Sequence, residues 1–189
     1  MMKLYLIRHA ESKANVASDL DNPTYYFDAR ITKRGVKQAQ KLKKQIQNIP
    51  FDGYFSSPLT RTLETFSILF PDNQPFIDPQ LREHLFHSCD IGRQPKYLKK
   101  EFKKFNFDHL KEYWWNNDIP INENKIVQEN LNKTKIRLKS FLLSIKNLKF
   151  TNVVVISHGT FLKQITGYMM DNCELYKCDF KTIYERFFD

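Results

Sequence analysis

The stretch Lys3-Leu-Tyr-Leu-Ile-Arg-His-Ala-Glu11 begins as a short apolar run and ends in three ionisable side chains. An apolar run of this length, bounded by charged residues, is typical of a strand that is buried on both faces of a parallel sheet. Charged side chains at the end of a buried strand cost desolvation free energy unless a partner or ligand compensates them. The stretch therefore predicts a buried strand that carries Arg8, His9 and Glu11 to the edge of the core.

Two further segments have the same character as this first strand. Residues 152–157 form a second buried run, and Gly53–Ser56 follows a turn-like Pro-Phe-Asp-Gly sequence. Helical periodicity marks residues 32–48, 59–70, 95–113, 124–148 and 161–170, and Thr32 is expected to cap the first of these helices. Strands that alternate with helices predict an α/β fold with a layered sheet. No internal repeat or linker divides the chain, so we expect residues 1–189 to form a single domain.

The composition narrows the range of partners. The chain has 189 residues and a formal net charge of +9. Its lysine runs, at residues 41–44 and 99–104, lie on helical patterns, which favours a solvated basic surface over a site for an anionic partner. No arginine-rich or aromatic-interleaved platform supports nucleic-acid binding, so we expect no nucleic-acid partner.

The cysteines and the hydropathy of the sequence indicate the cellular compartment in which we expect the protein. Cys89, Cys173 and Cys178 lack the spacing of a metal site, and their odd number favours reduced thiols. We find no signal peptide, and no apolar run approaches the ~20 residues of a membrane span. A cytoplasmic protein without a membrane partner is expected.

A polar motif follows each of the three predicted strands. These motifs are Arg8-His-Ala-Glu11, Ser56-Ser-Pro-Leu-Thr-Arg61 and Ser157-His-Gly159. In an open α/β sheet the ligand lies beyond the carboxyl ends of the strands. Each motif places a cation or an imidazole at such an end, and together they predict one shared functional site.

The ordered set of motifs resembles the histidine phosphatase (phosphoglycerate mutase-like) superfamily. The matching positions, from residue 3 to about 180, are Arg8-His-Ala-Glu11 with Asn15, Ile31-Thr-x-x-Gly35-x-x-Gln38-Ala39, Ser56-Ser-Pro-x-x-Arg61-x-x-x-Thr65, Leu81-Arg-Glu83, Ser157-His-Gly159 and Asn172-Cys173, which precedes a last strand. The resemblance implies a three-layer αβα sandwich with a mostly parallel central sheet.

The resemblance also implies roles for individual residues. His9 would be the nucleophile that forms a phosphohistidine, which requires its other ring nitrogen to be held as a donor, most simply by a backbone carbonyl. Arg8 and Arg61 would bind phosphate oxygens as planar cationic forks. His158 would add a third donor and Asn15 a neutral one. These groups leave no chemical need for a metal or another cofactor.

Glu83 matches the general acid of the family. A carboxyl group in a partly desolvated site beside a phosphate dianion is expected to have a raised pKa and to stay protonated near neutrality. Glu11 is expected to pair with an arginine or to orient the pocket. Two of these residues have an alternative, purely structural role. Arg61 could form a helix-surface ion pair with Glu64, and His158 could be a histidine of the core.

The chain departs from the family pattern in two places, and three histidines receive no role. Ala10 stands where the family usually has glycine, which bears on the tightness of the pocket. Residues 84–115 replace a glycine-rich turn, and their aromatic side chains either form a lid or pack in the core on a helix. His84, His87 and His109 are expected to be ordinary polar residues.

The sequence as a whole favours a metal-independent phosphomonoesterase that works through a phosphohistidine on His9. A mutase, which returns the phosphoryl group to a rebound product, is one alternative, and a catalytically silent module that binds phosphoproteins is another. Small-molecule phosphate esters and phosphoproteins both remain open as substrates, because specificity lies in variable loops. The oligomeric state is not predicted.

Overall fold

The computed structural model describes residues 2–17, 27–117 and 128–188, and its centre is a five-stranded sheet in the order β3-β2-β4-β1-β5. The strands are β1 (Lys3–Arg8), β2 (Gly53–Ser56), β3 (Phe76–Ile77), β4 (Asn152–Ser157) and β5 (Leu175–Asp179). Neighbouring strands are parallel except for β5, which pairs antiparallel with β1. The predicted mostly parallel sheet is confirmed.

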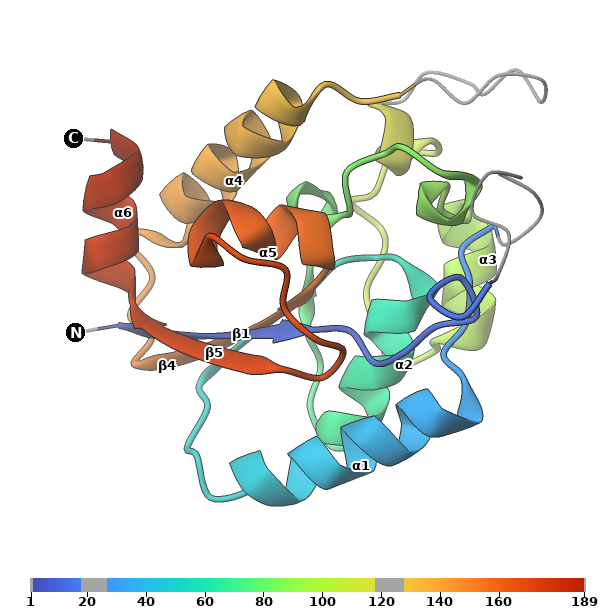
Figure 1. Cartoon of the computed structure of the whole chain (residues 1–189), viewed down its shortest axis with the longest axis horizontal. Coiled ribbons are helices and arrows are strands. Elements are labelled where there is room, and N and C mark those ends of the chain that lie inside the picture. Colours follow the sequence, from blue (N-terminus) through green and yellow to red (C-terminus); the bar gives the residue numbers. More distant parts are fainter. Residues whose placement is uncertain (1, 18–26, 118–127, 189) are drawn as a thin grey trace.

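Helices cover both faces of the sheet (Figure 1). One face packs against α1 (Lys33–Ile46) and α2 (Thr60–Leu69), and the other against α4 (Leu131–Ile145), α5 (Gly159–Thr166) and α6 (Phe180–Phe188). Side chains alternate along β1, so that Leu4 and Leu6 are buried on the α4 side while Tyr5 and Ile7 are buried on the α1 side. The three-layer αβα sandwich is confirmed.

The predicted helix over residues 95–113 is wrong beyond its first two turns. Helix α3 (Pro95–Glu101) ends where the Phe102 N–H bonds back to the Leu98 carbonyl. The chain then continues irregularly to a short 3₁₀ helix, η3 (Trp114–Asn116). Its aromatic side chains are buried in a cluster with Leu59 and Leu63, and they include Phe107, Trp114 and Trp115. Their spacing resembles a helical period, but they pack in the core without forming the predicted α-helix.

Other boundaries differ by smaller amounts. Helix α4 begins at Leu131, where the Asn130 side chain accepts a hydrogen bond from the Asn132 N–H; part of the start that we predicted, residues 124–127, lies outside the described residues. Helix α5 ends before Gly167, which has a φ of 82°. Strand β5 follows Asn172-Cys173 as the resemblance implies, whereas β3 and α6 were not predicted. None of the helices in the described ranges is long and apolar enough to cross a membrane.

The start of α1 lies directly against the loop that follows β1. The Thr32 N–H donates to the Glu11 carbonyl, and the Thr32 hydroxyl caps the helix by accepting from the Gly35 N–H at 3.0 Å. A Cβ atom on Gly35 would lie 2.3 Å from the Glu11 carbonyl oxygen. Glycine at this position therefore allows helix and loop to approach closely.

Gly35→Ala is expected to destabilise the fold by about 2 kcal/mol, because the added methyl group forces backbone atoms apart. Thermal unfolding followed by circular dichroism measures the effect as a lower Tm. Gln40→Ala, on the exposed side of the same helix, is the control and should leave Tm nearly unchanged. Equal Tm values for the two variants would contradict the close approach.

Candidate active site

The carboxyl ends of β1, β2 and β4 lie at one edge of the sheet and bring the three motifs together. In the strand register Arg8 is opposite Ser157, and the His9 N–H donates to the Ser157 carbonyl at 2.9 Å. Ser57 continues β2 and donates its N–H to the Ile156 carbonyl. As a result, the ring centroids of His9 and His158 are 5.2 Å apart although the residues are distant in sequence.

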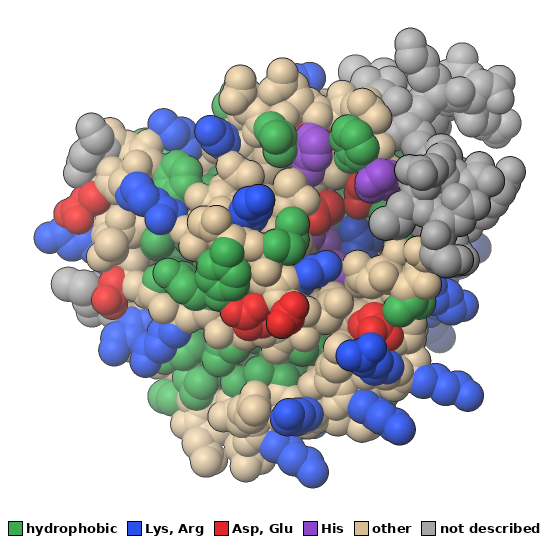
Figure 2. All heavy atoms as spheres, viewed as in Figure 1, with side chains coloured by type: hydrophobic (Ala, Val, Ile, Leu, Met, Phe, Trp, Pro, Cys, Tyr) green, Lys and Arg blue, Asp and Glu red, His purple; other side chains and the backbone are tan. Residues whose placement is uncertain are grey.

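A pocket of about 400 Å³ opens at this edge. Figure 2 shows histidine, acidic and basic atoms gathered in the corresponding hollow. The lining includes five of the six residues that we assigned to the site, namely Arg8, His9, Asn15, Arg61 and Glu83. The lining also includes three residues for which we predicted no role in the site, namely Asp90, His84 and His87.

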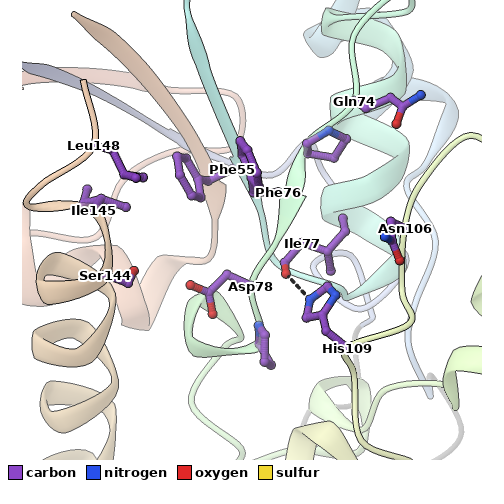
Figure 3. Close-up of a pocket in the computed structure, with 12 residues that line it drawn as sticks. Phe55, Gln74, Phe76, Ile77, Asp78, Asn106, His109, Ser144, Ile145 and Leu148 are labelled. Carbon is purple, nitrogen blue, oxygen red and sulfur yellow. Dashed lines mark hydrogen bonds between the residues drawn. The ribbon is translucent and has the colours of Figure 1, made fainter. Parts of the chain in front are cut away.

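A larger cavity, of about 650 Å³, lies beside β3 and the carboxyl end of α4 (Figure 3). Its walls are mainly apolar, with Phe55, Phe76 and Ile145 facing Asp78 and His109. Its described lining contains no lysine or arginine, so the cavity does not suit a phosphate dianion. The smaller pocket, which contains both arginines, is the candidate active site.

His9 is buried and held in one tautomer. Its Nδ1 atom is 2.7 Å from the Ala10 carbonyl oxygen, which only accepts, so Nδ1 carries the proton and Nε2 is free of one. Burial, followed by the nearby charges of Arg61 and Arg8, lowers the pKa of His9 well below its ordinary value. The neutral imidazole thus keeps a lone pair on Nε2.

Ala10 fits its position without backbone strain. It is fully buried, and it is not among the described residues with positive φ. Its N–H donates to the Thr65 hydroxyl at 3.0 Å, which ties the loop after β1 to α2. The methyl group that replaces the family's usual glycine therefore leaves the loop closely packed.

Arg61 lies in the pocket wall, with its side chain 4% exposed. Its Nε donates to His158 Nδ1 at 3.3 Å, its Nη1 to the Cys89 carbonyl at 2.6 Å, and its Nη2 to Asp90 at 3.1 Å. Each Nη atom has a second N–H, so the fork remains able to bind an oxyanion. The alternative of an ion pair with Glu64 is wrong, because Glu64 pairs with Arg30 at 2.7 Å.

Arg8 offers the second guanidinium of the pocket. Its Nη1 donates to the Met170 carbonyl at 2.5 Å. Its Nε is buried and has no hydrogen-bond partner among the residues that the structure describes. A buried N–H without a partner is costly, and an anionic oxygen would satisfy it.

His158 lies behind Arg61 and does not line the pocket. It is fully buried, and its Nδ1 accepts from Arg61 Nε while its Nε2 is 2.8 Å from the Ser57 hydroxyl. Burial, with the charge of Arg61 next, lowers the pKa of His158 well below its ordinary value. In this arrangement the neutral ring supports Arg61 from outside the pocket lining, whereas the resemblance implies a third phosphate donor.

Glu83 lies at the amino end of α5. Its carboxyl oxygens accept N–H bonds from Thr160 and Phe161, both at 3.0 Å, and from His84 at 2.8 Å. Burial and the charge of Asp90 raise the pKa of Glu83, while these N–H bonds and Arg61 act against the increase. The pKa of Glu83 is therefore shifted upward, which is the direction that a general acid requires.

Arg137 fixes the backbone that carries Glu83. Its guanidinium donates to the carbonyl oxygens of Gln80, Arg82 and Glu83 and forms a 2.7 Å ion pair with Glu129. The side chain is nearly buried, at 6% exposure. No sequence signal in the predicted α4 helix identified this support.

Asn15 and Glu11 have different surroundings. The Asn15 Oδ1 accepts from the N–H and the hydroxyl of Ser12 and from Asn172 Nδ2. Glu11 does not line the pocket. Its carboxylate accepts from the Thr32 hydroxyl at 2.7 Å and pairs with Arg34 at 3.3 Å, which links the loop to α1.

Two curated proteins with phosphatase names are similar to most of this chain. A relative from Hydrogenobacter thermophilus, provisionally named phosphoserine phosphatase 2, is 28% identical over 181 residues, which is 91% of this chain and 82% of the relative. Adenosylcobalamin/alpha-ribazole phosphatase of Escherichia coli is 24% identical over 163 residues, covering 83% of this chain and 73% of that protein.

Solved structures share the fold. Phosphoserine phosphatase from Entamoeba histolytica, in complex with 3-phosphoglyceric acid, superposes with a TM-score of 0.62 at 23% identity, covering 96% of this chain and 92% of the other.

The sequence model of the histidine phosphatase superfamily (branch 1) matches residues 4–179. This range includes all six residues that we assigned to the site, and the protein is therefore an enzyme of the histidine phosphatase superfamily.

Proposed function

We propose that this enzyme is a metal-independent phosphomonoester hydrolase that works through a phosphohistidine on His9. The observation that carries the proposal is the fixed tautomer of His9, because the Ala10 carbonyl holds the proton on Nδ1 and leaves Nε2 as a nucleophile. The pocket supplies two guanidinium groups beside it, from Arg8 and Arg61. Phosphoryl transfer depends mainly on positioning and charge stabilisation, which these groups provide.

The reaction has two steps. In the first, Nε2 of His9 bonds to phosphorus as the bond to the ester oxygen breaks, and Glu83 gives its proton to the departing oxygen. In the second, the Glu83 carboxylate takes a proton from water as the water oxygen bonds to phosphorus and the bond between phosphorus and Nε2 of His9 breaks. Inorganic phosphate and the alcohol are the products, and both His9 and Glu83 return to their starting states.

Hydrolysis is favoured over the mutase reaction by the charges of the pocket. Arg8 and Arg61 are the two Lys or Arg side chains among the described lining residues, and both belong to the phosphate end. A mutase must hold its phosphorylated product while water is excluded. A second anionic group on such a product would meet the carboxyl groups of Glu83 and Asp90. A silent phosphoprotein-binding module has no use for a neutral, oriented His9.

The size of the pocket, about 400 Å³, supports a small-molecule phosphate ester as the substrate. The relatives named above as phosphoserine and alpha-ribazole phosphatases point to the same class. We place the reaction in the cytoplasm and in a single domain; the free thiols of Cys89, Cys173 and Cys178 support the reducing compartment.

Release of phosphate from p-nitrophenyl phosphate and from a panel of alkyl phosphates tests the proposal. Activity should persist in EDTA at mildly acidic pH. A parallel assay for isomerisation of 3-phosphoglycerate separates the mutase, which would convert this substrate faster than it releases phosphate. Absence of hydrolysis with every ester would contradict the proposal.

Glu83→Gln is expected to lower kcat for an alkyl phosphate by about 10²-fold and to affect p-nitrophenyl phosphate much less, because p-nitrophenolate leaves without a proton. Steady-state kinetics on the two esters measure this difference. Glu11→Gln is the matched control, since Glu11 contacts α1 outside the pocket. Glu11→Gln should lower kcat for both esters by a similar factor. Equal losses for Glu83→Gln on both esters would show that the proton donor is another group.

A further inference from the structure

Asp90 places a second carboxylate in a pocket that is built for an anion. It belongs to the 3₁₀ helix η2 (Ser88–Asp90), and its side chain is 5% exposed. It lines the pocket together with Glu83 and Arg61. A negative charge here opposes phosphate binding, so its presence calls for a function that outweighs this cost.

The carboxylate of Asp90 is held on both sides. One oxygen, Oδ1, pairs with Arg61 Nη2 at 3.1 Å. The other, Oδ2, accepts the N–H groups of Phe86 at 3.2 Å and His87 at 3.0 Å. These bonds keep the charge at a fixed point of the wall, beside the guanidinium that the reaction uses.

We propose that Asp90 is a positioning residue for proton transfer, whose fixed charge keeps the catalytic proton on Glu83 until the leaving oxygen takes it. The inference rests on the proposed function of Glu83 as the general acid. The two carboxyl groups line the same pocket, and the charge that Arg61 holds on Asp90 disfavours a second charge on Glu83. Because Asp90 has the ion pair with Arg61, the single proton belongs to Glu83.

The groups around Glu83 agree with this division of roles. Burial and the charge of Asp90 raise the pKa of Glu83, and Arg61 acts in the opposite direction. Other charged or titratable groups near Glu83 are Arg8 at the end of β1, Cys89 in η2, the adjacent residue His84, and Arg137 of α4, which donates to the Glu83 carbonyl. The backbone N–H groups of α5 also favour the carboxylate. Among these groups Asp90 is the fixed anion whose charge favours the protonated form of Glu83.

The test is the pH dependence of kcat/KM for Asp90→Asn, measured with an alkyl phosphate and with p-nitrophenyl phosphate. Removal of the charge should lower the pKa of Glu83 and move the alkaline limb for the alkyl ester by about one pH unit toward acid, with about a tenfold loss above the limb. The limb for p-nitrophenyl phosphate should stay in place, because that ester needs no acid. Ionisation of each ester is the same for both enzymes and cancels in the comparison.

Controls separate this role from a structural one. Asp108→Asn makes the same charge change at an exposed site and should leave both profiles unchanged. Asp90→Glu restores the charge and should bring the alkyl limb back toward the wild-type position. If Asp90→Asn does not fold, Asp90→Ser also removes the charge and takes its place.

Three outcomes are distinguishable. A limb shift for the alkyl ester alone supports the inference. An equal loss on both esters without a shift overturns it and makes Asp90 a structural residue. If wild-type activity is insensitive to Glu83→Gln, the proposed acid itself is wrong, and the inference about Asp90 fails with it.

Discussion

Replacing His9 by alanine is expected to lower kcat by a factor of about 10⁵ or more for every ester, because no other described group can take over the attack on phosphorus. Arg8, Arg61 and Glu83 would remain in place, but without a nucleophile they only bind the substrate. The Ala10 carbonyl loses its donor, a local change at the end of β1. The far-ultraviolet circular dichroism spectrum should therefore match that of the wild type.

The matched control is His109→Ala. His109 is exposed and lines the larger cavity away from the active site, where it bonds to the Ile77 carbonyl. This variant should keep wild-type kcat. If His9→Ala kept about a tenth of the wild-type kcat, the role of His9 as nucleophile would be lost.

Arg61→Lys should lower kcat/KM by about 10³-fold, which corresponds to about 4 kcal/mol of transition-state stabilisation. Arg61 donates in three directions to His158, Cys89 and Asp90 and still has N–H groups for phosphate. A lysine ammonium carries its donors on one atom and cannot serve these directions together. Steady-state kinetics on p-nitrophenyl phosphate measure the loss.

Arg30→Lys is the control for this change. Arg30 has the surface ion pairs with Glu64 and Glu101, so the charge-conserving substitution should change kcat/KM by less than about twofold. A loss of less than about threefold for Arg61→Lys would remove Arg61 from the reaction.

The regular elements near the site were predictable because their periodicity is strong. The apolar runs of β1, β2 and β4 and the amphipathic patterns of α1 and α2 come from burial against the sheet. Strand β3 has two residues, Phe76 and Ile77, which is too short for any pattern. Between α3 and η3 the aromatic residues are buried by contacts with α2, and no local rule reveals such contacts.

In the candidate site, too, sequence patterns predict some features, while tertiary contacts decide others. The order of the motifs brought His9, Arg8, Arg61 and Glu83 to one pocket, because strand ends meet at one edge of the sheet. The contact between Asp90 and Arg61 joins an irregular loop to α2, and a sequence pattern does not predict it. For the same reason the position of His158 behind Arg61 became visible only in three dimensions.

The covalent intermediate is the central claim, and trapping it tests that claim most directly. The enzyme is mixed with a ³²P-labelled phosphate ester, quenched in denaturant at alkaline pH, where a phosphohistidine survives, and digested for peptide mapping. We expect label on the peptide that contains His9, lost on treatment with acid and absent from the His9→Ala variant. Turnover of the ester with no label on His9 at any quench time, or label on another residue, would contradict the account.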